Sequence, residues 1–170
     1  GDMSLGGGDD TVTMDGSATA GGNIDLGDGT NTFSISDDAV LTGAITGGAD
    51  VDTVTITDDS TVIGDIDLGT GANTLTLDTT ADYSGAITAG DGNDTVTLTG
   101  TASTLTGDMS LGGGDDTVTM DGSATAGGNI YLGDGTNTFS ISDDAVLTGA
   151  ITGGADVDTV TITDDSTASS

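Results

Sequence analysis

The segment Gly43–Ile63, GAITGGADVDTVTITDDSTVI, decides the fold, because its 21-residue pattern recurs along the whole chain. Within it, apolar Ile45, Val54 and Ile56 alternate with polar residues, and runs of Gly and Asp separate the alternating stretches. Alternation with a period of two is typical of a β-strand with one buried face. Gly and Asp are poor helix formers and common turn residues, so the segment predicts three short strands joined by turns. We expect each strand to be about three to five residues long.

The 170 residues divide into eight such repeats, which we call rungs, if the chain is cut before each recurring Gly. The rungs are 1–21, 22–42, 43–63, 64–84, 85–106, 107–127, 128–148 and 149–170, and we treat 1–170 as a single repeat domain. The sequence also contains a longer repeat, because residues 1–61 recur as residues 107–167. The two copies differ at one position, which is Asp25 in the first copy and Tyr131 in the second. The offset of 106 residues equals five rungs and one inserted residue, which we place within 99–106.

Three positions in the rung are apolar in all eight repeats. The third position holds Ile or Met, the twelfth holds Val, Leu or Phe, and the fourteenth holds Met, Ile or Leu. A weaker apolar segment follows at positions 18 to 20, as in Ala39 and Leu41. A single rung cannot bury its own apolar face, whereas stacked rungs place each column of side chains above itself and share one core. We therefore predict an all-β, right-handed parallel β-solenoid, a rod about 38 Å long, with Phe33 and Phe139 pointing inward.

The composition excludes several classes of protein. All 29 acidic residues are Asp, and Lys, Arg, His and Cys are absent, so the net charge is −29. Without a cationic side chain the protein cannot neutralise the phosphates of a nucleic acid or adsorb to an anionic membrane surface. Without Cys or His it forms no disulfide framework and no zinc, haem or thiolate centre. The sequence contains no run of about 18 apolar residues that could span a membrane. It does not open with the basic segment and the apolar segment of a signal peptide. We expect that a leader was removed or that the chain is part of something longer.

In-register stacking also brings the Asp residues of successive rungs together. Two carboxylates one rung apart repel by about 1 kcal/mol in water and by about 3–4 kcal/mol at an effective dielectric constant of about 20. Because the chain contains no Lys or Arg, solution cations, a bound metal or interleaved Asn must relieve this repulsion. Carboxylates on Gly-rich turns suit a hard cation with oxygen ligands, so we expect calcium, Ca2+.

The turn between the third and eleventh positions carries a local motif. Residues 89–97, AGDGNDTVT, resemble the calcium-binding nonapeptide G-G-x-G-x-D-x-U-x of RTX-like, hemolysin-type repeats, with Ala in the first place. Residues 5–13, LGGGDDTVT, and their copy 111–119 match it with Leu in the first place. Residues 68–76, LGTGANTLT, look like the related turn of calcium-dependent ice-binding RTX adhesins, with Asn73 in place of the family's Asp.

The resemblance implies an oxygen cage, built from the Asp side chain and glycine carbonyls of one rung with groups of the next. The residues that match the motif's Asp are Asp10, Asp52, Asp94, Asp116 and Asp158. Further acidic residues in the same turns are expected to assist: Asp9, Asp28, Asp50, Asp91, Asp115, Asp134 and Asp156. The column departs from the family at Asn31, Asn73 and Asn137. A metal-free ladder, in which Asn and Asp hydrogen-bond along the column, therefore remains open as an alternative.

A second acidic edge lacks the glycine spacing and is interpreted as solvated turn residues. It contains Asp15, Asp37, Asp38, Asp58, Asp59, Asp78, Asp121, Asp143, Asp144, Asp164 and Asp165. Asp is a favoured residue in turns. The paired Asp residues resemble the acid and nucleophile of a glycosidase only superficially, because they recur in several rungs and no Arg, Lys, His or Glu accompanies them. We expect no enzymatic activity.

Each rung also places two polar residues, mostly Thr, on the exposed side of the strand at positions 11 and 13. The ranks include Thr11, Thr13, Thr53, Thr55, Thr74, Thr76, Thr95 and Thr97. They resemble the ice-binding surface of solenoid antifreeze proteins, although Thr is also the usual polar residue of an exposed strand. Ice binding is the alternative function.

The sequence favours a structural protein over these alternatives. Exposed end strands of a solenoid recruit another strand, so we expect head-to-tail stacking of copies or continuation in a longer repeat chain. The RTX resemblance implies secretion and folding in extracellular calcium. We therefore expect an extracellular spacer or filament of a bacterial surface adhesin, a biofilm matrix fibre or a surface layer.

Overall fold

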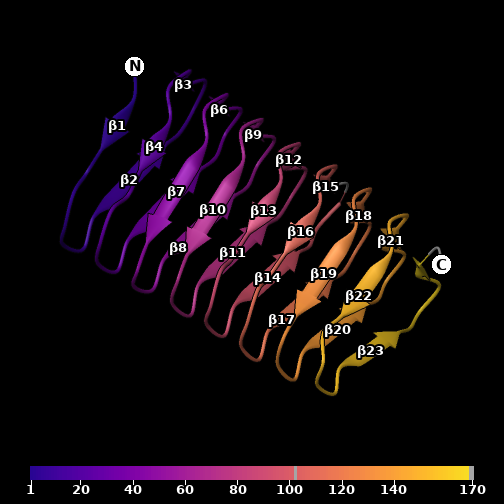
Figure 1. The fold of residues 1–170 in the computed structure, drawn as a ribbon. Coiled ribbons are helices and arrows are strands. Elements are labelled where there is room, and N and C mark those ends of the chain that lie inside the picture. The colour runs from indigo at the N-terminus through magenta and orange to yellow at the C-terminus, as the bar shows by residue number, and fades with distance from the viewer. Residues whose placement is uncertain (102, 169–170) are drawn as a thin grey trace.

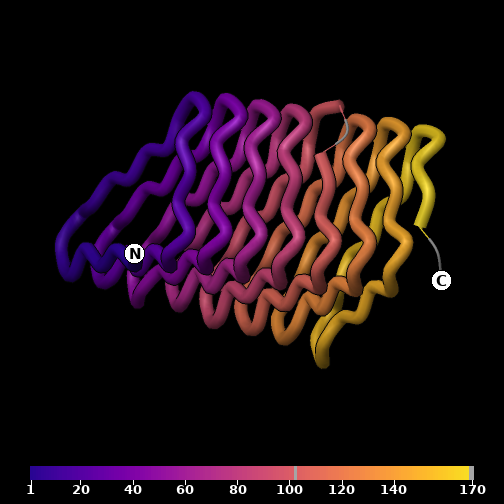
Figure 2. Tube along the Cα trace, turned by 90° about the horizontal axis from the view of Figure 1, so that it is seen from above, coloured from indigo at the N-terminus to yellow at the C-terminus, as the bar shows by residue number. Residues whose placement is uncertain are grey.

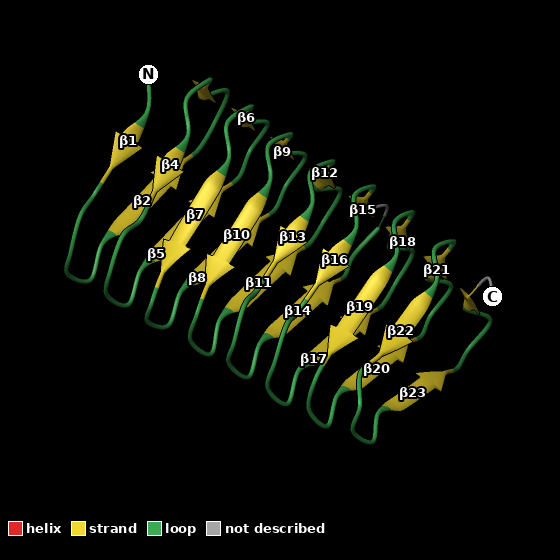
Figure 3. Cartoon of the chain, viewed as in Figure 1, coloured by secondary structure: helices red, strands yellow, loops and turns green. Residues whose placement is uncertain are grey.

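The computed structural model describes residues 1–101 and 103–168, and these form an all-β solenoid of about eight turns. Each turn contributes one strand to each of three parallel sheets, and no helix occurs in the described ranges (Figures 1 and 3). The first and the last described residues lie at opposite ends of the rod (Figure 2). The predicted fold class is confirmed, whereas the right-handed coiling stays a prediction.

The first two sheets contain mostly four-residue or two-residue strands. Sheet 1 contains β1 (Met3–Ser4), β4 (Ile24–Asp25), β7 (Ile45–Gly48), β10 (Ile66–Gly69), β13 (Ile87–Thr88), β16 (Met109–Ser110), β19 (Ile130–Gly133) and β22 (Ile151–Gly153). Sheet 2 contains β2 (Thr11–Met14), β5 (Thr32–Ile35), β8 (Thr53–Ile56), β11 (Thr74–Leu77), β14 (Thr95–Leu98), β17 (Thr117–Met120), β20 (Thr138–Ile141) and β23 (Thr159–Ile162).

The third sheet is built from two-residue strands only. These strands, like β1, β4, β13 and β16 of sheet 1, are shorter than the three to five residues expected. Sheet 3 contains β3 (Thr19–Ala20), β6 (Val40–Leu41), β9 (Thr61–Val62), β12 (Asp82–Tyr83), β15 (Thr104–Leu105), β18 (Thr125–Ala126), β21 (Val146–Leu147) and β24 (Thr167–Ala168). Turns on either side of these strands take up the rest of the segment, because each rung of about 21 residues contributes a strand to all three sheets.

Strand pairing keeps the columns in register, apart from a local shift between β19 and β22, where Gly133 pairs with Gly153. Thr74 pairs with Thr95 at an offset of 21 residues, whereas Thr95 pairs with Thr117 at an offset of 22. In sheet 3 the offset is already 22 between Asp82 and Thr104. The inserted residue therefore lies between Leu98 and Thr104, inside the predicted range 99–106, and neither flanking strand loses its register.

Parallel pairing directs backbone hydrogen bonds along the rod in both directions. On the side of sheet 1, Ile24 N donates to Ala44 O of the next rung at 2.8 Å, and Asp28 N, in the turn that follows, donates to Gly6 O of the preceding rung at 2.8 Å. At the start of sheets 2 and 3, Thr32 N donates to Asp10 O and Val40 N to Ala18 O of the preceding rung, both at 2.9 Å. Because a strand in a parallel ladder both donates to and accepts from each neighbour, each end of the rod carries unpaired donors and unpaired acceptors on all three sheets.

The predicted columns form one continuous core. Phe33 and Phe139 are fully buried, which confirms the predicted phase of sheet 2. Tyr83 is the largest fully buried side chain, and its hydroxyl donates to Ala86 O at 2.5 Å and accepts from Ile66 N at 3.0 Å. The fifth position, which the sequence analysis did not identify, is also buried at Leu26, Leu68, Leu111 and Leu132.

The second acidic edge consists of tight turns, as expected. In the turn that follows β5, both Asp37 (φ 56°) and Asp38 (φ 63°) have positive φ, and Ala39 N donates to Ser36 O at 3.3 Å. Two consecutive residues with positive φ characterise a type I′ turn, which Asp tolerates better than most residues. The same position in the fourth rung holds Thr79 (φ 50°) and Thr80 (φ 63°), where a β-branched side chain is strained.

The recurring glycine at the first position of each rung is required by close packing of the backbone. A Cβ atom on Gly43 would lie 2.0 Å from Gly22 O, and one on Gly64 would lie 2.3 Å from Gly43 O. Neither glycine has φ in the left-handed region, so space alone excludes a side chain here. The rungs consequently stack at the separation of hydrogen-bonded strands along this edge.

Candidate cation sites in an internal polar column

The five Asp residues that match the RTX motif lie in the tenth column, which we call the polar column, and its side chains point into the rod. The column contains Asp10, Asn31, Asp52, Asn73, Asp94, Asp116, Asn137 and Asp158. Its residues are buried from Asn31 to Asn137, and Asp10 and Asp158 in the end rungs are half-buried. The tenth position precedes the buried twelfth and fourteenth positions of sheet 2 by the strand period of two, which accounts for the inward direction.

A continuous ladder of hydrogen bonds joins the polar column. Each backbone N–H donates to the Oδ1 atom of the same column one rung further on. The donors and acceptors are Asp10 N to Asn31, Asn31 N to Asp52, Asp52 N to Asn73, Asn73 N to Asp94, Asp94 N to Asp116, Asp116 N to Asn137, and Asn137 N to Asp158, at 2.8–3.1 Å. The ladder that was left open as an alternative is therefore present. Its donors are backbone N–H groups, and Asn137 Nδ2 also donates to Asp158 Oδ1 at 2.9 Å.

The second polar atom of each side chain distinguishes Asn from Asp. In the Asn rungs Nδ2 donates to a glycine carbonyl of its own turn, from Asn31 to Gly29 O at 2.9 Å and from Asn73 to Gly71 O at 3.1 Å. Asn137 repeats this contact with Gly135 O at 3.2 Å. The inner side of the glycine turn thus presents carbonyl oxygens that require a donor.

Asp offers no donor to these carbonyls when it is ionised. The Oδ2 atoms of Asp10, Asp94 and Asp116 are buried and have no hydrogen-bond partner. Each occupies the place of an Asn Nδ2, in a turn whose sixth- and eighth-position glycines have positive φ, as in the Asn rungs. A buried carboxylate oxygen beside carbonyl oxygens requires a proton or a cation. These three rungs therefore fit a hard cation on the chemistry of their donor atoms.

Asp52 is satisfied by the backbone, because its turn differs. Position eight of this rung is Asp50, and neither Gly48 nor Asp50 has positive φ. In this conformation Gly48 N donates to Asp52 Oδ2 at 3.0 Å. The eighth rung carries the same substitution at Asp156, and a Cβ atom on Gly153 would lie 1.9 Å from Asp158 Oδ2. The five Asp residues that the motif groups together thus have at least two different environments.

Asp94 and Asp116 are the one step in the polar column at which two Asp residues follow each other. Each is 1% exposed, and Asp94 N donates to Asp116 Oδ1 at 2.8 Å. Burial raises the pKa of each carboxyl group from 3.8 to about 6, and Asp116 adds to the rise at Asp94. The cost of ionising both groups is thus concentrated between the fifth and sixth rungs.

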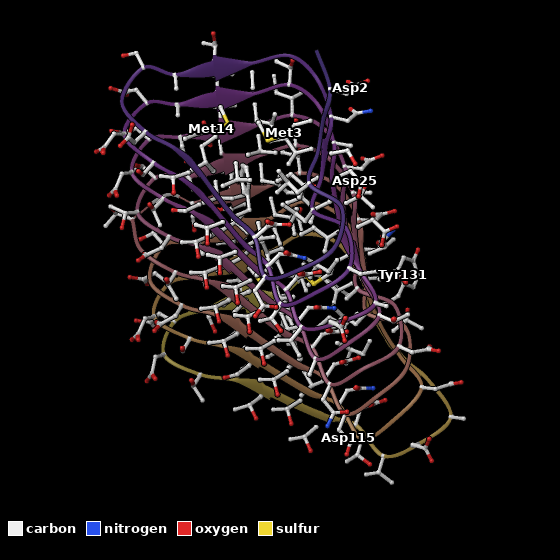
Figure 4. All side chains as sticks on the ribbon, turned by 90° about the vertical axis from the view of Figure 1, so that its left-hand side faces the viewer. Asp2, Met3, Met14, Asp25, Asp115 and Tyr131 are labelled. Carbon is white, nitrogen blue, oxygen red and sulfur yellow. The ribbon has the colours of Figure 1, made fainter. Side chains whose placement is uncertain are left out.

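The seven assisting Asp residues lie on the outside of the turns and are exposed: Asp9, Asp28, Asp50, Asp91, Asp115, Asp134 and Asp156. Figure 4 shows Asp115 at the outer margin of the rod. Several carboxylates accept backbone N–H groups of an adjacent rung, as from Thr30 N to Asp9 Oδ1 at 3.0 Å and from Thr136 N to Asp115 Oδ1 at 2.8 Å. Within residues 1–101 and 103–168, no three acidic side chains converge to hold a metal. The structure therefore separates the Asp residues of the polar column, which point into the rod, from the seven assisting Asp residues on its surface.

The Thr ranks lie on the outer face of sheet 2 in register. Thr53 pairs with Thr74 and Thr74 with Thr95, while Thr55, Thr76 and Thr97 form the parallel rank two positions along. Thr11 and Thr13 occupy the same columns in the first rung. Ser34 and Ser140 replace Thr in the second rank.

Compared with known proteins, the chain matches no family model, no curated protein and no solved structure. In the part of the chain that the structure describes, no helix is long and apolar enough to cross a lipid bilayer.

Proposed function

We propose that this chain is a structural, rod-forming module of a bacterial cell surface, serving as an extracellular spacer or filament of an adhesin, a matrix fibre or a surface layer. The observation that supports this function is the unbroken parallel pairing of all three sheets from the first rung to the last. Such a rod extends along one axis, and further rungs can lengthen it because each rung contacts only its neighbours. Its net charge of −29 opposes contact along its sides.

We further propose that calcium stabilises the rod from within. Asp10, Asp94 and Asp116 are the residues that would hold it, because their Oδ2 atoms are buried without a partner. Bound calcium would supply positive charge to a core that contains no cationic side chain. The outer Asp residues add a negative field that attracts cations from solution.

Circular dichroism and thermal unfolding in EDTA and in millimolar calcium test this proposal. We expect calcium to raise the melting temperature and EDTA to lower it, with magnesium as the control for a nonspecific effect of ionic strength. Identical spectra and melting curves in all three solutions would show that the hydrogen-bonded ladder suffices without metal. Electron microscopy of the folded sample tests the rod independently, because a compact globular particle would contradict it.

The in-register Thr ranks favour ice binding as a second candidate. Thr53, Thr55, Thr74 and Thr76 present hydroxyl and methyl groups at the repeat of adjacent strands. Thermal hysteresis that Thr53→Tyr abolishes, and that the outward substitution Thr46→Tyr on sheet 1 leaves unchanged, would establish this function. Absence of hysteresis in the folded protein would exclude it.

A further inference from the structure

The apolar columns are open at both ends of the rod. At the C-terminal end, Val160 is 48% exposed and Ile162 is 49% exposed, although their counterparts Val54 and Ile56 are fully buried. At the N-terminal end, Met3 is 45% exposed, whereas its repeat Met109 is fully buried. Figure 4, which views this end, shows Met3 and Met14 within the outline of the rung and Asp2 and Asp25 outside it.

If the C-terminal end of one copy met the N-terminal end of another, the eighth rung would contact the first rung. The chain already contains internal rungs that resemble each of these two surfaces. The sixth rung, 107–127, has the same sequence as the first, and it packs on the fifth, 85–106. The eighth rung repeats the main features of the fifth at the columns that contact the next rung. The corresponding pairs are Ile87 and Ile151, Asp94 and Asp158, Val96 and Val160, Leu98 and Ile162, and Ser103 and Ser166.

The turn of the eighth rung has its own internal precedent. Its sequence GADV, residues 154–157, repeats residues 48–51 of the third rung, on which the glycine turn of the fourth rung packs. There Thr70 N donates to Gly48 O at 2.9 Å. The glycine turn of a first rung therefore fits over this kind of turn.

We infer that the eighth rung binds the first rung of a second copy in register, head to tail, so that Thr159 pairs with Thr11; this inference rests on the proposed rod function. Both ends present unpaired N–H and carbonyl groups on all three sheets. Because the strand pairs of the rod are parallel, only a junction of unlike ends continues the parallel pairing, whereas a junction of like ends would set the strands antiparallel.

The junction also continues the polar column. Internally, Asp94 N donates to Asp116 Oδ1 at 2.8 Å. At the junction Asp158 N donates in the same way to Asp10 Oδ1 of the second copy. Because a head-to-tail contact of this kind does not close on itself, successive copies form a filament.

Two blocked variants test the polarity of the contact. Val160→Asp places a charge on the apolar C-terminal surface, and Met3→Asp does so at the N-terminal surface, while Thr161→Asp and Ser4→Asp add the same charge to the outer faces of the same strands. In light scattering with millimolar calcium, we expect the wild type and both outer-face controls to form filaments and each blocked variant alone to remain a 16.2 kDa monomer. An equimolar mixture of the two blocked variants should stop at the dimer, because one unblocked pair of ends remains.

Cysteine cross-linking tests the register. Thr159→Cys mixed with Thr11→Cys should form a disulfide-linked dimer, whereas Thr159→Cys mixed with Thr13→Cys should not. A monomeric wild type, dimers of Val160→Asp alone, or equal cross-linking to positions 11 and 13 would each overturn the inference. Circular dichroism of the same samples confirms that the variants fold, and a calcium-dependent rod that stays monomeric would overturn the junction while leaving the proposed rod function standing.

Discussion

Replacing Asp94 by Asn should stabilise the protein in the absence of calcium. The substitution removes a buried Oδ2 atom without a partner, which costs about 1–3 kcal/mol, and supplies an Nδ2 donor for the turn carbonyl, as at Asn73. It also removes the repulsion between Asp94 and Asp116. We expect a net gain of about 2 kcal/mol, which corresponds to a rise of about 4–8 °C in the melting temperature of a chain of this size.

The same variant separates the calcium proposal from the metal-free ladder. In EDTA, thermal unfolding should show Asp94→Asn above the wild type; in millimolar calcium the gain should vanish or reverse, because only the wild type retains the ligand. A gain of equal size in both solutions would refute calcium binding at Asp94, and a loss in EDTA would refute our account of the orphan oxygen. Asp52→Asn is the matched control. It should lower stability by about 1–2 kcal/mol in both solutions, because Asp52 Oδ2 accepts the N–H of Gly48.

Three further predictions follow from described contacts. Acidification in EDTA should stabilise the protein, because the pKa values of Asp94 and Asp116 are raised to about 6. The gain in stability appears as the pH falls through about 6 toward 3.8, and after solvent screening it amounts to about 1–2 kcal/mol per group. Melting curves across this pH range check it, and a pH dependence of the melting temperature that is unchanged in Asp94→Asn would contradict it. Phe33→Ala should cost about 3–5 kcal/mol in chemical unfolding because Phe33 is fully buried, whereas Ser34→Ala on the outer face of the same strand should change stability by less than about 0.5 kcal/mol. Thr79→Asn should raise stability by about 1 kcal/mol by relieving a β-branched residue at φ 50°, and a melting temperature equal to or below that of the wild type would show that the turn is not strained.

The fold was predictable because the decisive signal is repeated. Positions three, twelve and fourteen are apolar in every rung. A parallel β-solenoid is the architecture that stacks these positions in register and buries all of them in one core. The fifth position was overlooked because Gly47, Ala89 and Gly153 interrupt its Leu residues. At the two glycines the polar column occupies the space of a side chain, since a Cβ atom would lie 2.4 Å from Asp52 Oδ2 on Gly47 and 1.9 Å from Asp158 Oδ2 on Gly153.

The candidate site was predicted by residue type but not by direction. The motif identified the Asp of the tenth position, yet the strand period that makes Val12 and Met14 inward-facing extends to Asp10, and this signal was available in the sequence. The different environments of Asp94 and Asp52 could not be predicted from the sequence, because they depend on the backbone conformation of the turn. Replacing the eighth-position glycine by Asp50 changes φ at Gly48 and turns an N–H group toward the carboxylate.

The location of the first and last rungs at opposite ends of the rod determines how the rod responds to mechanical tension (Figure 2). A force applied between the ends loads the hydrogen bonds of the outermost rung first, so rungs peel away one after another. Each released rung exchanges a rise of about 4.8 Å for roughly 70 Å of extended backbone. Because every rung is bonded only to its neighbours, the remainder of the rod keeps its structure while the end unwinds, and it offers an intact template for rewinding when the force falls. The rod is therefore extensible under tension.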